Sequence, residues 1–194
     1  VPGAGKTTEA LAFYSYFKNT IDTVIIISPK NAFKAWYDEI QTSKGCFVEN
    51  QNKLKIIQNR EVLPYGDIFD NEKFLILNYE KITKLKEFIV NTLSEKNVLL
   101  IIDESHAIKA PNSRRTIEAL SIAHLAKYKI ILSGTPIPNK LTEIVTQFRF
   151  LYPSLNLSEN EILNEIQKIY VRTTRDELGI PGLNKKDTIT CLPL

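Results

Sequence analysis

The segment "NVLLIIDESHAIK", from Asn97 to Lys109, decides the fold. Its five apolar residues, Val98–Ile102, predict a strand that is buried on both faces, as in a parallel sheet covered by helices. Asp103 and Glu104 follow at once, at the end where such a strand delivers residues to a ligand crevice. Placing two adjacent carboxylates directly after an apolar strand costs free energy unless they have a ligand or partner. The segment therefore predicts an α/β sheet with functional acids at its edge.

Short β-branched runs alternate with helical patterns along most of the chain. Further strands are expected at residues 23–28, 53–58, 74–77 and 129–133, and helices at 7–18, 32–41, 82–93, 113–125 and 141–151. This alternation predicts an α/β fold, a mostly parallel sheet with helices on both faces. After Tyr152 prolines and glycines interrupt the pattern, with one more helix expected at 159–170. We expect one domain over residues 1–151, followed by a helical and extended segment over 152–194.

Composition and charge limit the function classes. The chain has 194 residues, 43% hydrophobic and 24% charged, which is typical of one globular domain. A net charge of +3 permits a nucleic-acid partner without arguing for one, because binding depends on where the basic residues lie. Cys46 and Cys191 stand far apart, so neither a disulfide framework nor a zinc site is expected, and a reducing compartment is the default. No apolar run is long enough to span a bilayer, so no membrane partner is expected.

The first eight residues, V-P-G-A-G-K-T-T, match the end of the phosphate-binding loop pattern G-x-x-x-x-G-K-[ST]. Gly5, Lys6 and Thr7 fit its last three positions, so we expect the first glycine and a preceding strand to lie before Val1 in a longer protein. The backbone of such a loop and the start of the next helix bind phosphates. Lys6 would contact the β- and γ-phosphates of ATP, and the Thr7 hydroxyl would ligate Mg²⁺. The expected ATP-binding residues are Gly3, Ala4, Gly5, Lys6, Thr7 and Thr8. The alternative is a glycine-rich turn that only begins a helix.

Asp103 and Glu104 supply the second half of a nucleotide site. Asp103 would hold Mg²⁺ through water, and Glu104 would polarise the water that attacks the γ-phosphate. Lys6, Asp103 and Glu104 are therefore the expected catalytic residues, and Thr7 and Asp103 the expected metal ligands. For the acids alone, the alternative is a solvated helix N-terminus at a strand end. His106 is assigned no proton transfer; we expect it to relay the state of the γ-phosphate.

Seven motifs stand in one order along nearly the whole chain. Besides "GKT" and "DESH", they include "SPKNAFKAWYDEI" (28–40), "LNYEKI" (77–82), "SGTPIPN" (133–139), "FRFLYP" (148–153) and "VRTTRDELGIP" (171–181). This set resembles helicase superfamily two, and within it the Swi/Snf-like DNA-translocating ATPases of the D-E-S-H type. The chain departs from that pattern with P-G-A-G-K-T for M-G-L-G-K-T, Lys109-Ala110 for K-N, and R-T-T-R at 172–175 for R-R-x-K. These departures leave the subfamily open.

The resemblance implies the first of two RecA-like P-loop lobes, with ATP between the lobes and double-stranded DNA bound independently of sequence. It implies that His106, Ser133, Gly134 and Thr135 couple hydrolysis to movement. The DNA contacts that it implies are Ser28, Pro29, Lys30, Asn78, Tyr79, Lys109, Arg114 and Arg115. A solvated surface is the alternative for Lys30, Arg114 and Arg115, and Trp36 is expected to pack in the core. The second lobe would supply an arginine to the transition state, so this lobe alone should bind nucleotide but hydrolyse it slowly.

We therefore predict an ATP hydrolase, the ATP-binding lobe of a DNA translocase that uses ATP and Mg²⁺ in the cytoplasm of a bacterial, phage or viral system or in a nucleus. The alternatives are a restriction- or viral-type superfamily-two motor subunit, another P-loop ATPase such as a nucleotide kinase, and a binding module that has lost catalysis. Every version of the motor hypothesis depends on one geometric expectation. The GKT turn and the carboxylates at 103 and 104 must face each other across a single gap.

Overall fold

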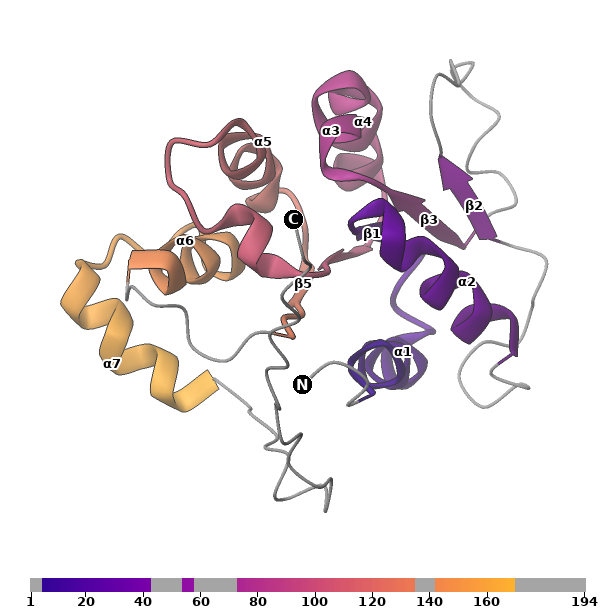
Figure 1. Ribbon diagram of the computed structural model, residues 1–194, viewed down its shortest axis with the longest axis horizontal. Coiled ribbons are helices and arrows are strands. Elements are labelled where there is room, and N and C mark those ends of the chain that lie inside the picture. Colours follow the sequence, from indigo (N-terminus) through magenta and orange to yellow (C-terminus); the bar gives the residue numbers. More distant parts are fainter. Residues whose placement is uncertain (1–4, 43–53, 58–72, 135–141, 170–194) are drawn as a thin grey trace, which may run out of the picture.

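The structure, a computed structural model, describes residues 5–42, 54–57, 73–134 and 142–169. In these ranges five parallel strands form one sheet in the order β2-β3-β1-β4-β5 (Figure 1). The strands are β1 Thr23–Ile27, β2 Leu54–Ile57, β3 Phe74–Leu77, β4 Val98–Ile102 and β5 Tyr128–Ile131. All five predicted strands are confirmed, and those at 74–77 and 98–102 agree residue for residue. The predicted parallel α/β sheet is confirmed with them.

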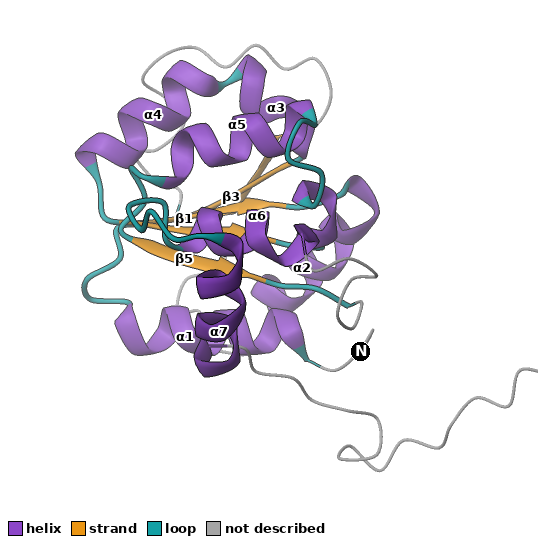
Figure 2. Ribbon diagram, turned by 90° about the vertical axis from the view of Figure 1, so that its left-hand side faces the viewer, coloured by secondary structure: helices purple, strands orange, loops and turns teal. Residues whose placement is uncertain are grey.

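Helices cover both faces of the sheet, as predicted. They are α1 Lys6–Phe17, α2 Phe33–Thr42, α3 Tyr79–Lys84, α4 Lys86–Glu95, α5 Arg114–Ala123, α6 Thr142–Leu151 and α7 Glu159–Ile169, with short 3₁₀ helices η1 Lys30–Ala32 and η2 Ser105–Ile108. Helices α1 and α2 pack on one face, and α3, α4, α5 and the end of α6 pack on the other. Figure 2 shows the sheet edge-on, with α3, α4 and α5 on one side and α1 on the other.

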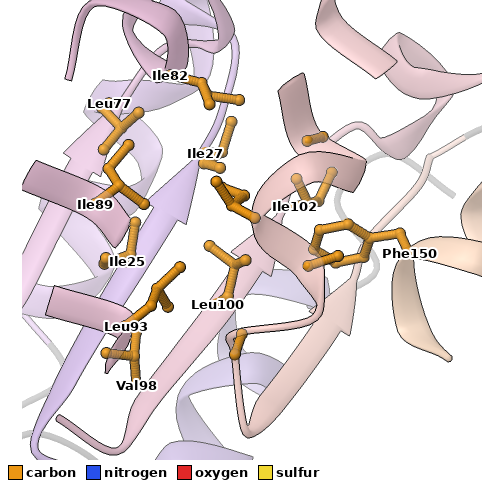
Figure 3. Packing of buried hydrophobic residues seen from close by; sticks show 14 of the residues in the cluster. Ile25, Ile27, Leu77, Ile82, Ile89, Leu93, Val98, Leu100, Ile102 and Phe150 are labelled. Atoms are coloured by element: carbon orange, nitrogen blue, oxygen red, sulfur yellow. The ribbon is translucent and has the colours of Figure 1, made fainter. Parts of the chain in front are cut away.

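The two cores follow from the alternation of side chains along each strand. In β1, Val24 and Ile26 point toward α1 and α2, whereas Ile25 and Ile27 point toward α4 and its neighbours. Every residue of β1, β3 and β4 is buried, so these strands need apolar side chains on both faces. Burying each such Ile or Leu side chain contributes about 1.5–3 kcal/mol. Figure 3 shows the second core, in which strand residues meet Ile89 and Leu93 of α4 and Phe150 of α6.

One expected helix is wrong in its extent. The single helix predicted at 82–93 is two helices, α3 and α4, which break at Leu85 (φ −110°, ψ 18°). The first begins three residues earlier than predicted, because Asn78 keeps extended dihedrals at the end of β3 and the chain turns into helix directly after it. Apolar residues recur at helical spacing across the break, so the periodicity does not reveal it. The early start places Tyr79 and Glu80 in the first turn of α3.

The predicted helix at 159–170 is confirmed as α7, which packs on α6 through Val145, Phe148 and Ile162. The rest of the segment from residue 170 to 194 lies outside the described residues, so the proposed division after residue 151 stays a prediction. Among the helices of the described ranges, none has both the length and the apolar content needed to cross a bilayer.

Candidate functional site

The carboxyl ends of the central strands bring the predicted site residues to one edge of the sheet. In the strand register, Ile27 of β1 pairs with Leu77 of β3 and with Ile102 of β4. The next residues, Ser28, Asn78 and Asp103, therefore stand abreast. The backbone N–H of Asp103 still donates to the Ile27 carbonyl at 2.9 Å, so the first acid is held as an extension of the sheet.

Asp103 is 7% exposed, and its carboxylate accepts three hydrogen bonds. Ser28 Oγ and Trp36 Nε1 donate to Oδ2 at 2.8 and 2.9 Å, and the backbone N–H of Glu104 donates to Oδ1 at 2.9 Å. Hydrogen bonds to an ionised group are strong, and this set fixes the orientation of the carboxylate. Oδ2 carries two donors, so Oδ1 is the oxygen with more remaining capacity to accept a ligand.

Glu104 has left-handed dihedrals, φ 50° and ψ 55°, and is the non-glycine residue with a positive φ in the described ranges. Such a conformation is uncommon outside glycine and clusters at functional sites. It directs the side chain toward the turn after β5, where Oε2 lies 3.4 Å from the Gly134 backbone N–H nitrogen. The same oxygen lies 3.2 Å from His106 Nδ1. The turn therefore aims the second carboxylate along the edge of the sheet.

Gly134 is the point where three predicted motifs meet. A Cβ added at Gly134 would lie 3.2 Å from Lys6 Nζ and 3.4 and 3.7 Å from the two carboxylate oxygens of Glu104. The lysine of the GKT turn and the second acid thus face one gap. Gly134 borders this gap and, having no side chain, leaves it open. The geometric expectation stated above is met for these groups. Ser133 lies in the same turn, and Thr135, expected to act with it, lies outside the described residues.

The N-terminal end of α1 brings Lys6 to this gap. Gly5 has a left-handed φ of 82°, which glycine adopts without strain, and Lys6 and Thr7 form the first turn of α1. The first N–H groups of a helix lack intrahelical partners and suit an anion. The Thr8 hydroxyl instead donates to Glu39 Oε1 at 2.8 Å, which ties α1 to α2. Gly3 and Ala4, also expected to contact ATP, lie outside the described residues.

These groups fit a magnesium nucleotide. A lysine ammonium and a helix N-terminus suit phosphate oxygens, and carboxylate and hydroxyl oxygens are ligands that Mg²⁺ prefers. Within the described residues no three His, Cys, Asp or Glu side chains gather as a metal cage. Mg²⁺ in nucleotide sites is usually held by one or two side chains together with substrate phosphates and water, so Thr7 and Asp103 would be a sufficient protein contribution.

Replacing Gly134 with Ala should lower kcat/KM for ATP by about tenfold, because a misplacement of reacting groups by a fraction of an ångström to one ångström carries such a cost. The added Cβ would press on Lys6 Nζ and on Glu104. Gly134 does not have a left-handed φ, so the backbone itself tolerates alanine. Steady-state ATPase kinetics on the full-length protein measure the effect, with the melting temperature as the control for folding. An unchanged kcat/KM would show that the gap is wider than the structure indicates.

A second feature is a basic hollow of about 1320 Å³ beside the acidic pair. It is lined by Pro29, Lys30, Asn78, Tyr79, Glu80, Lys81, Lys84, Glu104, His106, Ala107, Lys109, Ala110, Ser113, Arg114 and Arg115. Seven of the eight residues that the sequence assigned to DNA contact line this hollow, although they come from three separate segments. The eighth, Ser28, is buried and bonds to Asp103 instead. The hollow reaches Glu104 and His106, so it adjoins the nucleotide gap.

Glu80 holds Arg115 at one wall of the basic hollow. Its carboxylate pairs with Arg115 Nη2 at 2.5 Å and accepts from Asn78 Nδ2 at 2.8 Å. Partial burial alone would raise the pKa of Glu80, but hydrogen bonds from its own backbone and from Arg115, with the positive charge of Arg115, hold that pKa below its ordinary value. In the described part of the chain, Asn78 Oδ1 is the buried side-chain atom that lacks a hydrogen-bond partner.

Sequence reasoning missed several residues that support the site. Trp36 packs in the core, as expected, but its indole N–H also donates to Asp103. Trp36 and Glu39 stand three residues apart, which places them on one face of α2, and this spacing was the available signal. Lys81 and Lys84 enter the basic hollow because α3 begins early. On the far side, Ser105 Oγ donates to Gln147 Oε1 at 2.7 Å, which joins the acidic turn to α6.

Comparison with known proteins agrees with this geometry. A family model described as the SNF2-related domain matches residues 2–185. The chain belongs to the SNF2-related domain family. It is 26% identical to the ATP-dependent helicase FUN30 of Saccharomyces cerevisiae over 97% of this chain and 17% of that protein. It is 29% identical to the DNA annealing helicase and endonuclease ZRANB3 of Bos taurus over 78% of this chain and 14% of that protein. The SNF2-related chain thus spans less than a fifth of these relatives.

A solved structure shares the fold of this SNF2-related domain. The Sulfolobus solfataricus SWI2/SNF2 ATPase core, solved in complex with double-stranded DNA, superposes with a TM-score of 0.57 at 22% identity, over 91% of this chain and 36% of that chain. The predicted RecA-like α/β lobe and the Swi/Snf-like resemblance are both confirmed.

Proposed function

We propose that this SNF2-related domain is the ATP-binding lobe of an ATP-dependent motor that moves along double-stranded DNA. The convergence of Lys6 and Glu104 on Gly134 carries the proposal, because it joins the phosphate loop, the acidic pair and the turn after β5 at one point. The relatives named above, which are helicases, and the DNA-bound ATPase core of similar fold support the choice of DNA as the partner.

The hydrolytic step assigns one role to each side chain around the gap. Lys6 and the first N–H groups of α1 would bind the phosphates and offset the charge that develops on them. Glu104 would orient a water and accept its proton as the water oxygen bonds to the γ-phosphorus and the bond to the ADP oxygen breaks. Mg²⁺, when bound, would supply Lewis-acid stabilisation, with Thr7 and Asp103 as its protein side. His106 and Gly134 lie within 3.4 Å of Glu104 Oε2, and together with Ser133 they would transmit the change.

The basic hollow would bind the DNA backbone. Its lining carries six cationic side chains, Lys30, Lys81, Lys84, Lys109, Arg114 and Arg115, against the carboxylates of Glu80 and Glu104. Contacts from Lys and Arg to phosphates fix position without distinguishing sequence, which is what translocation requires. A second RecA-like lobe would supply the arginine of the transition state, and we propose that residues 152–194 lead toward it. The compartment would be that of the DNA, cytoplasm or nucleus.

The test is the ATPase turnover of the full-length protein with and without duplex DNA of mixed sequence. We expect duplex DNA to raise turnover at least about tenfold, since completing the transition-state environment is worth several orders of magnitude in related NTPases. An ATPase turnover that is the same with and without duplex DNA would refute the motor hypothesis.

Replacing Lys84 with Ala should weaken duplex binding about three- to fivefold near 0.1 M salt and reduce the slope of log affinity against log salt by about 1, as loss of one phosphate contact predicts. Lys84 is an exposed lysine of α3 at the hollow. Lys34→Ala is the matched control, because Lys34 is 84% exposed on α2 and pairs with Asp38 outside the hollow. Fluorescence anisotropy across a salt series measures both quantities. Equal effects of the two variants would contradict the assignment of the hollow.

A further inference from the structure

Tyr79 connects the basic hollow to the acidic turn. It is the first residue of α3, and it lines the hollow although only 4% of its surface is exposed. Its hydroxyl points inward and donates to the backbone carbonyl of Asp103 at 2.5 Å. The same hydroxyl lies 3.5 Å from the carbonyl of Glu104. One side chain therefore touches the proposed DNA surface and the backbone carbonyls of the peptides before and after the Glu104 Cα.

The hydrogen bond holds the peptide that leads into Glu104, the non-glycine residue with a positive φ in the described ranges. The carbonyl of Asp103 belongs to the peptide that enters Glu104, whose φ is 50°. A buried carbonyl needs a donor, and a left-handed non-glycine residue persists only where its surroundings hold it. The Tyr79 hydroxyl supplies that donor. The orientation of the Glu104 carboxylate toward Gly134 depends on this turn.

The outer face of Tyr79 is held by charged groups that a phosphate would disturb. The Arg115 guanidinium lies over the Tyr79 ring, 5.9 Å from its centroid. Glu80 fixes Arg115 in that position through their 2.5 Å pair. A DNA phosphate in the hollow would compete with Glu80 for Arg115, because phosphate offers the same bidentate oxygens and more charge. Movement of Arg115 would reach the Tyr79 ring directly.

We propose that the Tyr79 hydroxyl is the positioning group through which occupancy of the basic hollow sets the Asp103–Glu104 turn. The inference rests on the proposed function, since it explains how DNA accelerates hydrolysis. Tyr79 does not touch the reacting atoms. It acts through the backbone that aims Glu104, so its hydroxyl affects turnover more than binding of either ligand.

Tyr79→Phe in the full-length protein removes the hydroxyl and keeps the ring. We expect kcat at saturating duplex DNA to fall about tenfold, as misorientation of a catalytic group predicts. The Kd for duplex DNA and the KM for ATP should each change by less than about twofold. Thr92→Val is the matched control, because Thr92 Oγ1 also donates from a buried position to a backbone carbonyl, that of Phe88, at 2.8 Å. It should lower the melting temperature by an amount similar to Tyr79→Phe and leave kcat unchanged.

The outcomes separate this inference from the proposed function. If wild-type turnover rises with DNA and Tyr79→Phe turnover rises equally, the inference alone is overturned. If the variant loses DNA affinity and turnover in the same proportion, Tyr79 is only a DNA contact and the inference is again overturned. If Tyr79→Phe does not fold, the hydroxyl has a purely structural role, and the inference is overturned. If DNA does not change the wild-type turnover, the proposed function is refuted, and this inference is refuted with it.

Discussion

Replacing Glu104 with Gln should lower the kcat for ATP hydrolysis by about 10²- to 10⁴-fold, the range that a positioned general base contributes. Glutamine has the shape of glutamate, tolerates the left-handed φ of 50° equally, and can still accept from the Gly134 N–H, which lies 3.4 Å from Oε2. It cannot take a proton from water. The expected loss is therefore confined to chemistry, and the affinity for nucleotide should change by less than about threefold.

Single-turnover hydrolysis and the binding of a fluorescent nucleotide measure the two quantities for Glu104→Gln separately. Glu118→Gln is the matched control, since Glu118 lies on α5, pairs with Lys86 at 3.1 Å and takes no part in the gap. The control should leave turnover unchanged. Full turnover in Glu104→Gln would favour the alternative in which the domain binds ligands without catalysis.

The fold was predictable because its signals are local. The five apolar residues 98–102 leave no face for solvent, and an acid directly after them marks the strand end, so β4 and its acids agree with the expectation residue for residue. Glycine at position 5 and lysine at 6 likewise specify a turn and a helix start within a few residues. The break at Leu85 was not predictable, because apolar residues continue at helical spacing through it.

The sequence predicted the chemical groups of the site but not the residues that hold those groups in position. Lys6 and Glu104 were marked by residue type beside a glycine-rich turn and a strand end, and Gly134 by the family resemblance; the fold then brings the three together. No sequence feature indicated which residues donate hydrogen bonds to the Asp103 carboxylate. Trp36 looks like an ordinary core residue in one sequence, and only the fold shows that its N–H points to a carboxylate from a strand 67 residues further along the chain.

Helix α2 carries the support that sequence reasoning missed. Through Glu39 it holds Thr8 and the start of α1, and through Trp36 it holds Asp103. The phosphate loop and the first acid are therefore fixed to the same rigid element, three residues apart on one face. This arrangement makes the position of Asp103 dependent on buried hydrogen bonds, so a change at Asp103 should affect stability as well as catalysis, in contrast to Glu104.

Replacing Asp103 with Asn should lower the free energy of unfolding by about 1–3 kcal/mol, the cost of leaving a buried donor unpaired. Three donors face the carboxylate, two at Oδ2 and one at Oδ1. An asparagine amide has one acceptor oxygen, so either orientation sets its NH₂ group against an N–H, that of Trp36 or that of Glu104. Turnover should also fall by about 10²-fold or more, because the proposed metal ligand loses its charge. Denaturant unfolding and steady-state ATPase assays of the full-length protein measure the two losses.

Asp22→Asn is the matched control for stability. Asp22 is exposed and its Oδ2 accepts one hydrogen bond, from the Asn97 backbone N–H at 2.8 Å. An asparagine there keeps that bond by turning its oxygen toward the donor, so the free energy of unfolding should change by less than about 0.5 kcal/mol. The pair of variants isolates the effect of donor number, since both replace one carboxylate oxygen with NH₂. If Asp103→Asn proved as stable as Asp22→Asn, Trp36 and Glu104 could not both be donating to Asp103, and the dependence of the site on α2 would be wrong.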